Sequence, residues 1–291
     1  MTGPERGFLL LSSHLGDPSR KPLTAAQLRT LGERVRNMES PRQDRELSET
    51  DLIQLGYGRE MARHIWQLLE DTDVLEHYLS RAQDCVPITR VSESYPATLH
   101  RRLAGEAPGC LWARGDLSLL NNPAISLVGS RELRPENRLF AESVGRLAAQ
   151  WGLTLVSGNA RGADKAAQNA CLEAGGSVIS IVADELEKHD PKENMLYLSE
   201  DGFDEAFSAQ RALSRNRCIH AFGQLTFVAQ ADLKRGGTWQ GTAANLRRSW
   251  SPVLCFRDGS AASFALEQLG AYLIDVEELA DFALPEQMAL F

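Results

Sequence analysis

Arginine follows glycine and serine at two points where an apolar run of the chain ends. The runs 124–128 and 153–156 lead into the turns Gly129-Ser130-Arg131 and Ser157-Gly158-Asn159-Ala160-Arg161-Gly162. Glycine lets a backbone come close to a ligand, and a guanidinium holds a phosphate with two parallel hydrogen bonds. These residue types in these turns predict a phosphate-binding cradle.

Strand and helix patterns alternate around the two turns. Residues 139–151 and 163–174 have apolar side chains at helical spacing, and the apolar runs 124–128, 153–156 and 178–182 have the length of buried strands. This alternation predicts an α/β fold with a doubly wound, mostly parallel sheet covered on both faces. Ligands of such sheets lie past the carboxyl ends of the strands, where both turns fall.

Further elements are expected on both sides of this core. Strands are predicted at residues 110–116, 225–229, 252–256 and 272–274, the first of them at the edge of the sheet. Residues 214–217 are predicted to be a loop in front of a helix at 218–222, and another helix is predicted at 243–249. Residues 184–205 hold nine acidic residues and two lysines, which favours an acidic loop.

Charge is distributed unevenly along the chain. The formal net charge is −8, which by itself gives no support to nucleic-acid binding. Residues 211–249, however, hold seven Lys or Arg and a single acid, Asp232. This basic island indicates either a localised anion site or the solvated faces of helices.

The five cysteines form neither a metal pattern nor a disulfide pattern. They are scattered and odd in number, and no Cys-x-x-Cys pair or zinc-type Cys/His spacing occurs. We therefore expect free thiols, a reducing cytoplasmic location, and no metal or cofactor. Every apolar stretch is shorter than a membrane span, so no membrane partner is expected.

The sequence predicts a helical domain (1–80), a connecting extension (81–121), the α/β domain (122–274) and an acidic tail (275–291). Thr24 and Ser48 are predicted helix N-caps. The stretch Leu55-Gly56-Tyr57-Gly58, with Ala62 and Ile65 further on, resembles a helix-hairpin-helix. In that motif the glycine turn presents N–H groups to a DNA phosphate. A plain pair of packed helices is the alternative.

Seven short motifs follow one another between residues 95 and 243. They are Tyr95-Pro96-x-x-Leu99, Leu111-Trp112-Ala113-Arg114-Gly115-Asp116, Ile125-Ser126-Leu127-Val128-Gly129-Ser130-Arg131, Ser157-Gly158-x-Ala160-Arg161-Gly162-x-Asp164, Pro191-Lys192-x-Asn194, Arg215-Asn216-Arg217 and Gly237-Thr238-x-x-x-Thr242-Ala243. In this order they resemble the DprA/Smf family of DNA-processing proteins, within a wider Rossmann-like superfamily. The resemblance covers about residues 85–260.

The chain departs from the family pattern at several points. Ala163 and Gln168 stand where Ile and His are common, and Asp184-Glu185-Leu186 replaces a glycine-rich turn. The C-terminal winged-helix domain of many members is expected to be absent, because few residues follow the last strands. The departures indicate a divergent subfamily and leave open a role in natural transformation.

The resemblance implies a non-enzymatic, homodimeric protein that binds single-stranded DNA and loads the recombinase RecA onto it. Arg131 is expected to contact phosphates, Arg161 either does the same or pairs with Asp164, and one of Arg215 and Arg217 faces the pocket. The implied DNA- and phosphate-binding residues are Gly129, Ser130, Arg131, Ser157, Gly158, Arg161, Gly162, Lys192, Asn194, Arg215, Arg217, Gly237 and Thr238.

No catalytic set is visible in the sequence. Asp164 has no Ser or His beside it in a known order, and Ser157 lacks the G-x-S-x-G pattern. The alternative function is a nucleotide-binding sensor or a LOG-type nucleotide phosphoribohydrolase, whose loop carries a leading proline and a glutamate. Residues 235–242 lack that proline, and Asn245 stands where the glutamate is expected, which favours binding over hydrolysis.

The last residues, Gln287-Met288-Ala289-Leu290-Phe291, resemble the bacterial sliding-clamp-binding peptide. Met288, Leu290 and Phe291 would fill an apolar pocket of the clamp, while Gln287 would hydrogen-bond at its rim. The alternative is that the tail buries Leu290 and Phe291 on its own domain or on a second copy, since exposed apolar side chains gain nothing in water.

Overall fold

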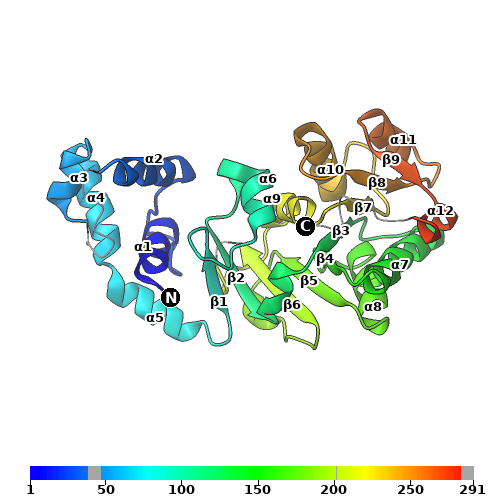
Figure 1. Cartoon of the computed structure of the whole chain (residues 1–291), viewed down its shortest axis with the longest axis horizontal. Helices are drawn as coiled ribbons and strands as arrows, with labels where there is room; N and C mark the ends of the chain where they lie inside the picture. Colours follow the sequence, from blue (N-terminus) through cyan, green and yellow to red (C-terminus); the bar gives the residue numbers. More distant parts are fainter. Residues whose placement is uncertain (39–46, 201, 283–291) are drawn as a thin grey trace.

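A helical N-terminal part lies beside a larger α/β part, with the two arranged along the long axis of the molecule (Figure 1). The computed structural model describes residues 1–38, 47–200 and 202–282. The helices of the N-terminal part are α1 (Gly3–Ser12), α2 (Ala25–Arg36), α3 (Glu49–Gln54), α4 (Arg59–Glu70) and α5 (Thr72–Arg81). The clamp-like residues Gln287, Met288, Leu290 and Phe291 lie outside the described residues.

Both predicted N-caps are present in the helical part. The Thr24 side chain accepts a hydrogen bond from the backbone N–H of Gln27, and the Ser48 side chain accepts one from that of Asp51. In each case the third helical residue reaches back to the cap, which completes a capping box. The starts of α2 and α3 are therefore set by local sequence.

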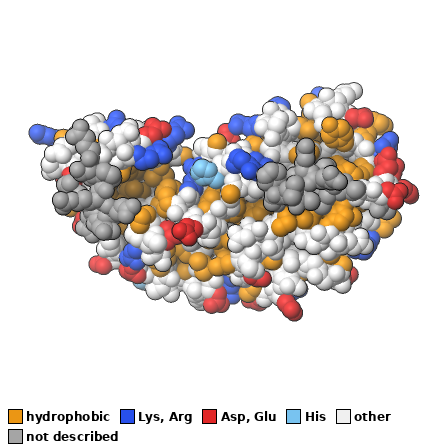
Figure 2. Space-filling model, viewed as in Figure 1, with side chains coloured by type: hydrophobic (Ala, Val, Ile, Leu, Met, Phe, Trp, Pro, Cys, Tyr) orange, Lys and Arg blue, Asp and Glu red, His pale blue; other side chains and the backbone are white. Residues whose placement is uncertain are grey.

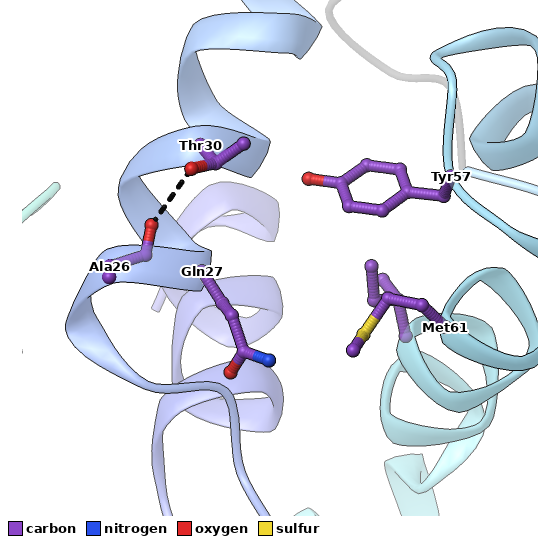
Figure 3. A pocket seen from close by; sticks show the side chains of 6 residues that line it. Ala26, Gln27, Thr30, Tyr57 and Met61 are labelled. Carbon is purple, nitrogen blue, oxygen red and sulfur yellow. Dashed lines mark hydrogen bonds between the residues drawn. The ribbon is translucent and has the colours of Figure 1, made fainter.

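The turn between α3 and α4 packs against α2. Figure 3 shows Tyr57 and Met61 pointing from the hairpin toward α2. A small, mainly apolar pocket of about 200 Å³ lies between these two side chains and α2. The Arg34 guanidinium lies 4.3 Å from the centroid of the Tyr57 ring, and burial raises the pKa of Tyr57. Binding of a phosphate at this hairpin stays a prediction.

The helical part is joined to the α/β part by a shared apolar core. Leu9 of α1 and Tyr78 of α5 are buried in the same cluster as Trp112 and Phe203 of the α/β part. The rings of Tyr78, Trp112 and Phe203 pack together, with centroids 4.8 to 5.5 Å apart. The division of the chain at residue 80 stays a prediction, but α1 and α5 do not stand apart from the core.

A nine-stranded sheet forms the centre of the α/β part, in the order β1-β2-β6-β5-β4-β3-β7-β8-β9 within the described residues. The strands are β1 (Val86–Thr89), β2 (Cys110–Gly115), β3 (Ala124–Val128), β4 (Thr154–Ser157), β5 (Ser177–Val182), β6 (Met195–Glu200), β7 (Thr226–Val228), β8 (Val253–Phe256) and β9 (Tyr272–Ile274). In sheet order, the seven strands β6, β5, β4, β3, β7, β8 and β9 pair in parallel with their neighbours. The pairs β1 with β2 and β2 with β6 are antiparallel. The predicted mostly parallel, doubly wound sheet is confirmed.

Two predictions about strands are wrong. β2 is not at the edge, because β1 pairs with it on the outer side. Part of the predicted acidic loop 184–205 is β6, a fully buried strand between β2 and β5. The apolar residues Met195, Leu196 and Leu198 place it in the core, and its one acid, Glu200, is neutralised by Arg217 at 2.9 Å.

Helices cover both faces of the sheet (Figure 1). They are α6 (Ala97–Leu103), α7 (Pro135–Gln150), α8 (Ala163–Glu173), α9 (Ala209–Phe222), α10 (Gly236–Arg248), α11 (Ala261–Gln268) and α12 (Val276–Ala280), with 3-10 turns at Ala104–Glu106, Leu117–Asn121 and Leu186–Lys188. Along β3, Ile125 and Leu127 enter the core beneath α7 and α8, while Ala124 and Val128 enter the core beneath α6, α9 and α11. This alternation buries β3 on both faces.

The predicted loop at 214–217 is also wrong. α9 begins at Ala209, because the Ser208 side chain caps it by accepting from the backbone N–H of Arg211. Arg215 and Arg217 are therefore helical residues, and they point in different directions since two positions turn a helix by about 200°.

All five cysteines are free and buried, as expected: Cys85, Cys110, Cys171, Cys218 and Cys255. Burial raises the pKa of Cys171 and that of Cys255 to about 12. Among the described helices, none is long and apolar enough to cross a membrane.

Candidate functional site

A cleft of about 620 Å³ lies past the carboxyl ends of β3 and β7. The chain passes from β3 through β4 and β5 to β6 on one side, and then returns through α9 to β7 on the other side of β3. The two crossovers diverge at this point and leave a crevice, which is the usual ligand site of a doubly wound sheet. The cleft therefore lies where the sequence predicts it.

The turn after β3 contributes Ser130 and Arg131 to the cleft. Gly129 comes first because no side chain fits there: a Cβ atom would lie 2.3 Å from the Cβ of Ala163 and 3.3 Å from that of Ala229. The absence of a side chain lets the start of α8 approach the turn, and Ala163 donates its N–H to the Ser130 carbonyl at 3.1 Å.

The turn after β4 is locked against the turn after β3. Gly162 has a φ of +84°, and a Cβ atom there would lie 2.4 Å from the carbonyl oxygen of Ser130. The carboxylate of Asp164 accepts from the backbone N–H of Ala160 at 3.1 Å. Glycine at 162 and aspartate at 164 thus shape the floor of the cleft.

Asp164 and Arg215 form a buried, oppositely charged couple under the floor. Burial raises the pKa of the Asp164 carboxyl, and the nearby Arg215 guanidinium opposes that shift. Arg215 donates to the carbonyl of Ile181 at the end of β5. Gly158 makes room for it, since a Cβ atom at 158 would lie 1.9 Å from a guanidinium nitrogen. Arg215 is thus the predicted arginine that faces the cleft, from below.

Two arginines on the cleft have no partner of their own. Across the described residues, the side chains of Arg131 and Arg235 make no hydrogen bond or ion pair, although both line the cleft. Arg161 differs, because its guanidinium lies 3.4 Å from the carboxylate of Glu132. It does not reach Asp164, so the suggested bracing of Asp164 by Arg161 is wrong. Unpaired guanidinium groups in a crevice are suited to an anion that arrives from solution.

The start of α10 also lines the cleft, directly after Arg235, which is the N-cap residue of this helix. Gly236, Gly237 and Thr238 line the cleft, and α10 has no side-chain cap. The first N–H groups of an uncapped helix are free to bind an anion. The helix begins at Gly236 rather than at 243 as predicted, which brings the glycine turn inside it.

The predicted site residues fall into four groups. Those that line the cleft are Gly129, Ser130, Arg131, Arg161, Arg215, Gly237 and Thr238. Ser157, Gly158 and Gly162 shape it from behind, and the Ser157 hydroxyl accepts from Gln168 at 2.6 Å. Lys192 and Asn194 are exposed in the loop before β6. Arg217 points away, toward Glu200 at 2.9 Å.

Sequence reasoning left out several residues on the cleft. Arg235, Asn216, Gln240, Phe207 and Leu213 all line it. Arg235 had a signal, since it immediately precedes Gly236-Gly237-Thr238. Phe207 had no such signal, because it follows the acidic stretch 184–205 and belongs to none of the seven motifs. No cluster of metal-ligating side chains occurs among the described residues.

Comparison with known proteins identifies the family. Residues 87–281 match the family described as DNA recombination-mediator protein A. The chain belongs to this family. The predicted resemblance is thereby confirmed, and the description of the family is that of a recombination mediator.

Relatives of the mediator family with similar sequences cover part of the chain. DNA processing protein DprA of Streptococcus pneumoniae is 33% identical over 141 residues, which is 45% of this chain and 50% of the relative. Protein Smf of Escherichia coli is 29% identical over 160 residues, which is 50% of this chain and 41% of the relative. The chain thus spans about half the length of the curated relatives it matches.

Two solved structures of the mediator family share the fold. The X-ray structure of DprA from Streptococcus pneumoniae covers 98% of this chain and 100% of its own, with a TM-score of 0.75 and 26% identity. DprA from Helicobacter pylori covers 68% of this chain and 97% of its own, with a TM-score of 0.56 and 23% identity. The Rossmann-like α/β architecture is therefore that of the family.

Proposed function

We propose that the chain binds single-stranded DNA in the cleft and serves as a mediator that loads RecA onto the bound strand. The observation that carries the proposal is the pair of unpartnered guanidinium groups, Arg131 and Arg235, beside the uncapped start of α10. Family membership supports the mediator role. The Helicobacter pylori relative is described for its single-stranded DNA binding mode, which supports the choice of ligand.

Charge is distributed unevenly over the surface of the molecule. Figure 2 shows Lys and Arg side chains gathered toward the upper margin of the visible face, with Asp and Glu more frequent along the lower and right-hand margins. A net charge of −8 repels a polyanion in general, so attraction has to be local. Binding through a few guanidinium groups releases condensed counterions and depends steeply on salt.

Each site residue has a place in this proposal. Arg131 and Arg235 contact phosphates directly, and the N–H groups at Gly237 and Thr238 add hydrogen bonds to the same backbone. Lys192 and Asn194 are proposed to meet the strand where it leaves the cleft. Ser157, Gly158, Gly162 and Arg215 are proposed to keep the cleft in shape.

Replacing Arg131 tests the proposal. We expect Arg131→Ala to weaken the binding of an oligo-dT strand about tenfold, because a charge-assisted hydrogen bond to a phosphate contributes about 1.5–3 kcal/mol. The loss should be similar for all base sequences, and the salt dependence of the affinity should decrease by about one phosphate contact. Fluorescence polarisation at several salt concentrations measures both effects.

The matched control is Arg146→Ala. Arg146 is an exposed arginine on α7 that contacts the hydroxyl of Ser143 and does not line the cleft. Equal affinities of the unaltered chain and Arg131→Ala would contradict the proposed site. Tight binding of a mononucleotide without binding of the strand would instead favour the nucleotide sensor.

Hydrolysis of a nucleotide has no support in the geometry. Asn245 is buried and accepts from the backbone N–H of Ser251 at 2.9 Å, while its amide nitrogen lies 3.0 Å from the Ser251 hydroxyl. It therefore supports the end of α10 and supplies no carboxylate to the cleft. A homodimer, RecA and the sliding clamp, the latter through Gln287, Met288, Leu290 and Phe291, remain proposed partners.

A further inference from the structure

The two walls of the cleft differ in chemistry. One wall carries the turns after β3 and β4 with their arginines, and the other is formed by the start of α9. At the beginning of the α9 wall, Phe207, Ala209, Ala212 and Leu213 line the cleft, and none of them carries a charge or a hydrogen-bonding side chain. Arg215 and Asn216 line the cleft one turn further along α9. Arginine-bearing turns together with an apolar patch at the beginning of α9 match the two halves of a nucleotide, its phosphate and its base.

Phe207 is more exposed than its local role in the helix explains. It immediately precedes the N-cap Ser208, where an apolar residue often packs on the fourth helical residue. That residue is Ala212, whose single methyl group covers little of a phenyl ring. Phe207 remains 55% exposed and Leu213 43% exposed, although both border a cleft.

The backbone that carries Phe207 is held firmly. Nη1 of Arg211 donates to the carbonyls of Ala183, Glu205 and Ala206 at 2.6 to 3.0 Å, and Nη2 donates to the Ser199 hydroxyl at 2.9 Å. The segment just before Phe207 is thus tied to the ends of β5 and β6. An aromatic ring on a fixed backbone is a preorganised contact surface.

The apolar wall meets the start of α10 directly. A Cβ atom at Gly237 would lie 3.5 Å from a methyl group of Leu213, and the Asn216 amide donates to the Gly237 carbonyl at 3.1 Å. Leu213 is therefore next to the N–H groups proposed to bind phosphate. A base attached to a phosphate at α10 would reach the α9 wall without crossing open solvent.

We propose that Phe207 and Leu213 form a base-stacking site for one nucleobase of the strand whose phosphates bind Arg131 and α10. The inference rests on the proposed function and adds the contact that separates a strand with bases from a bare polyanion. Stacking uses the face of the base, which all four bases have, so the site tolerates any sequence.

An abasic oligonucleotide distinguishes stacking from charge. It carries the same phosphates as oligo-dT but no bases. We expect Phe207→Ala to weaken the binding of oligo-dT about tenfold and to leave the affinity for the abasic strand unchanged. Phe207→Tyr should retain the affinity of the unaltered chain. The matched control is Phe264→Ala, which removes a 49% exposed phenylalanine from α11, outside the cleft lining.

Several outcomes would overturn the inference. Equal affinity of Phe207→Ala and the unaltered chain for oligo-dT would do so, as would an equal loss for oligo-dT and the abasic strand. If Arg131→Ala loses affinity while Phe207→Ala does not, the base site falls and the proposed function stands. If the unaltered chain binds neither strand, both proposals fall together.

Discussion

Arginines around the cleft differ in what already holds their guanidinium groups. Arg215 is buried over Gly158 and is bonded to Ile181, so it belongs to the framework. Arg161 forms an exposed ion pair with Glu132. Such a pair contributes little to stability, so a phosphate can displace the carboxylate. Only Arg131 and Arg235 offer all their donors to a ligand within the described residues. The contacts of each arginine, more than its position in a motif, define its role.

His220 is a second residue whose environment decides its behaviour. It is completely buried in α9, where Nδ1 lies 3.2 Å from the amide nitrogen of Asn245. Loss of solvation lowers its pKa from 6.5 to about 3. Between these pH values the unfolded chain binds one proton more than the folded chain, so the free energy of unfolding falls as the pH drops.

We expect His220→Gln to flatten this pH dependence. In the unaltered chain His220 lowers the free energy of unfolding by about 1.4 kcal/mol for each pH unit below its unfolded pKa, until the folded pKa is reached. The glutamine has no such titration. Urea unfolding at a series of pH values from neutral to mildly acidic measures the difference between the two slopes.

His100 provides the control for this measurement. It is an exposed histidine on α6, so His100→Gln should leave the slope unchanged. Identical slopes for His220→Gln and the unaltered chain would mean that His220 is not buried in its neutral form.

At the scale of elements, α7 and α8 pack unusually close together. A Cβ atom on Gly145 of α7 would lie 2.1 Å from the carbonyl oxygen of Ala167 in α8. The alanines of α8, among them Ala163, Ala166 and Ala167, present a shallow surface that allows this approach. The pair positions the turn after β4, because α8 begins where that turn ends.

We expect Gly145→Ala to destabilise the fold by about 1–3 kcal/mol, the range for overpacking of a tight core. Gly32→Ala is the matched control, because Gly32 lies inside α2 with nothing within 4 Å of its potential Cβ. That change should stabilise the chain by about 0.5–1 kcal/mol. Urea midpoints shifted in opposite directions support the close packing, and a stabilising Gly145→Ala would refute it.

The sequence predicts the elements whose pattern is local and misses those defined by their neighbours. Apolar runs and capping residues identify β3, β4, β5 and the helices between them, with errors of a few residues. β6 is hidden, because acids flank its apolar residues and the buried Glu200 is compensated by Arg217 from α9. β2 is not an edge strand, because β1 pairs with it. No local sequence pattern predicts this pairing.

The same distinction applies to the site. The turns with Arg131 and Arg161 are identified from glycine spacing, and both line the cleft. Arg235 precedes a glycine turn in the sequence, but only the structure shows that it lines the cleft and that, among the described residues, its guanidinium makes no ion pair. Phe207 joins the cleft because Arg211 ties its backbone to distant strands. Such contacts depend on the whole fold and cannot be predicted from spacing.

At the scale of the molecule, α1 and α5 of the helical part share an apolar core with the α/β part, whereas α2, α3 and α4 pack around a separate apolar cluster. Leu9, Leu75 and Tyr78 cover Trp112 and Phe203. The Tyr78 hydroxyl donates to Asp204 at 2.8 Å, and the guanidinium of Arg81 lies 2.8 Å from the same carboxylate. The buried aromatic cluster makes the N-terminal helices part of the stability of the sheet.

We expect a fragment that starts at residue 82 to have a lower urea midpoint than the whole chain and to bind a hydrophobic dye, because Trp112 and Phe203 lose their cover. Tyr78→Phe serves as the mild comparison, since it removes only a hydroxyl hydrogen bond worth about 1 kcal/mol. An unchanged midpoint and no dye binding for the fragment would show that the helices form an independent domain.

The buried cysteines have a practical consequence. Cys171 and Cys255 stay protonated at neutral pH, and the other three thiols are also buried. The thiolate is the reactive form, so we expect the folded chain not to react with maleimide reagents. A cysteine introduced at the exposed Gln240 on the cleft would then take up a fluorophore selectively, with every natural cysteine left in place.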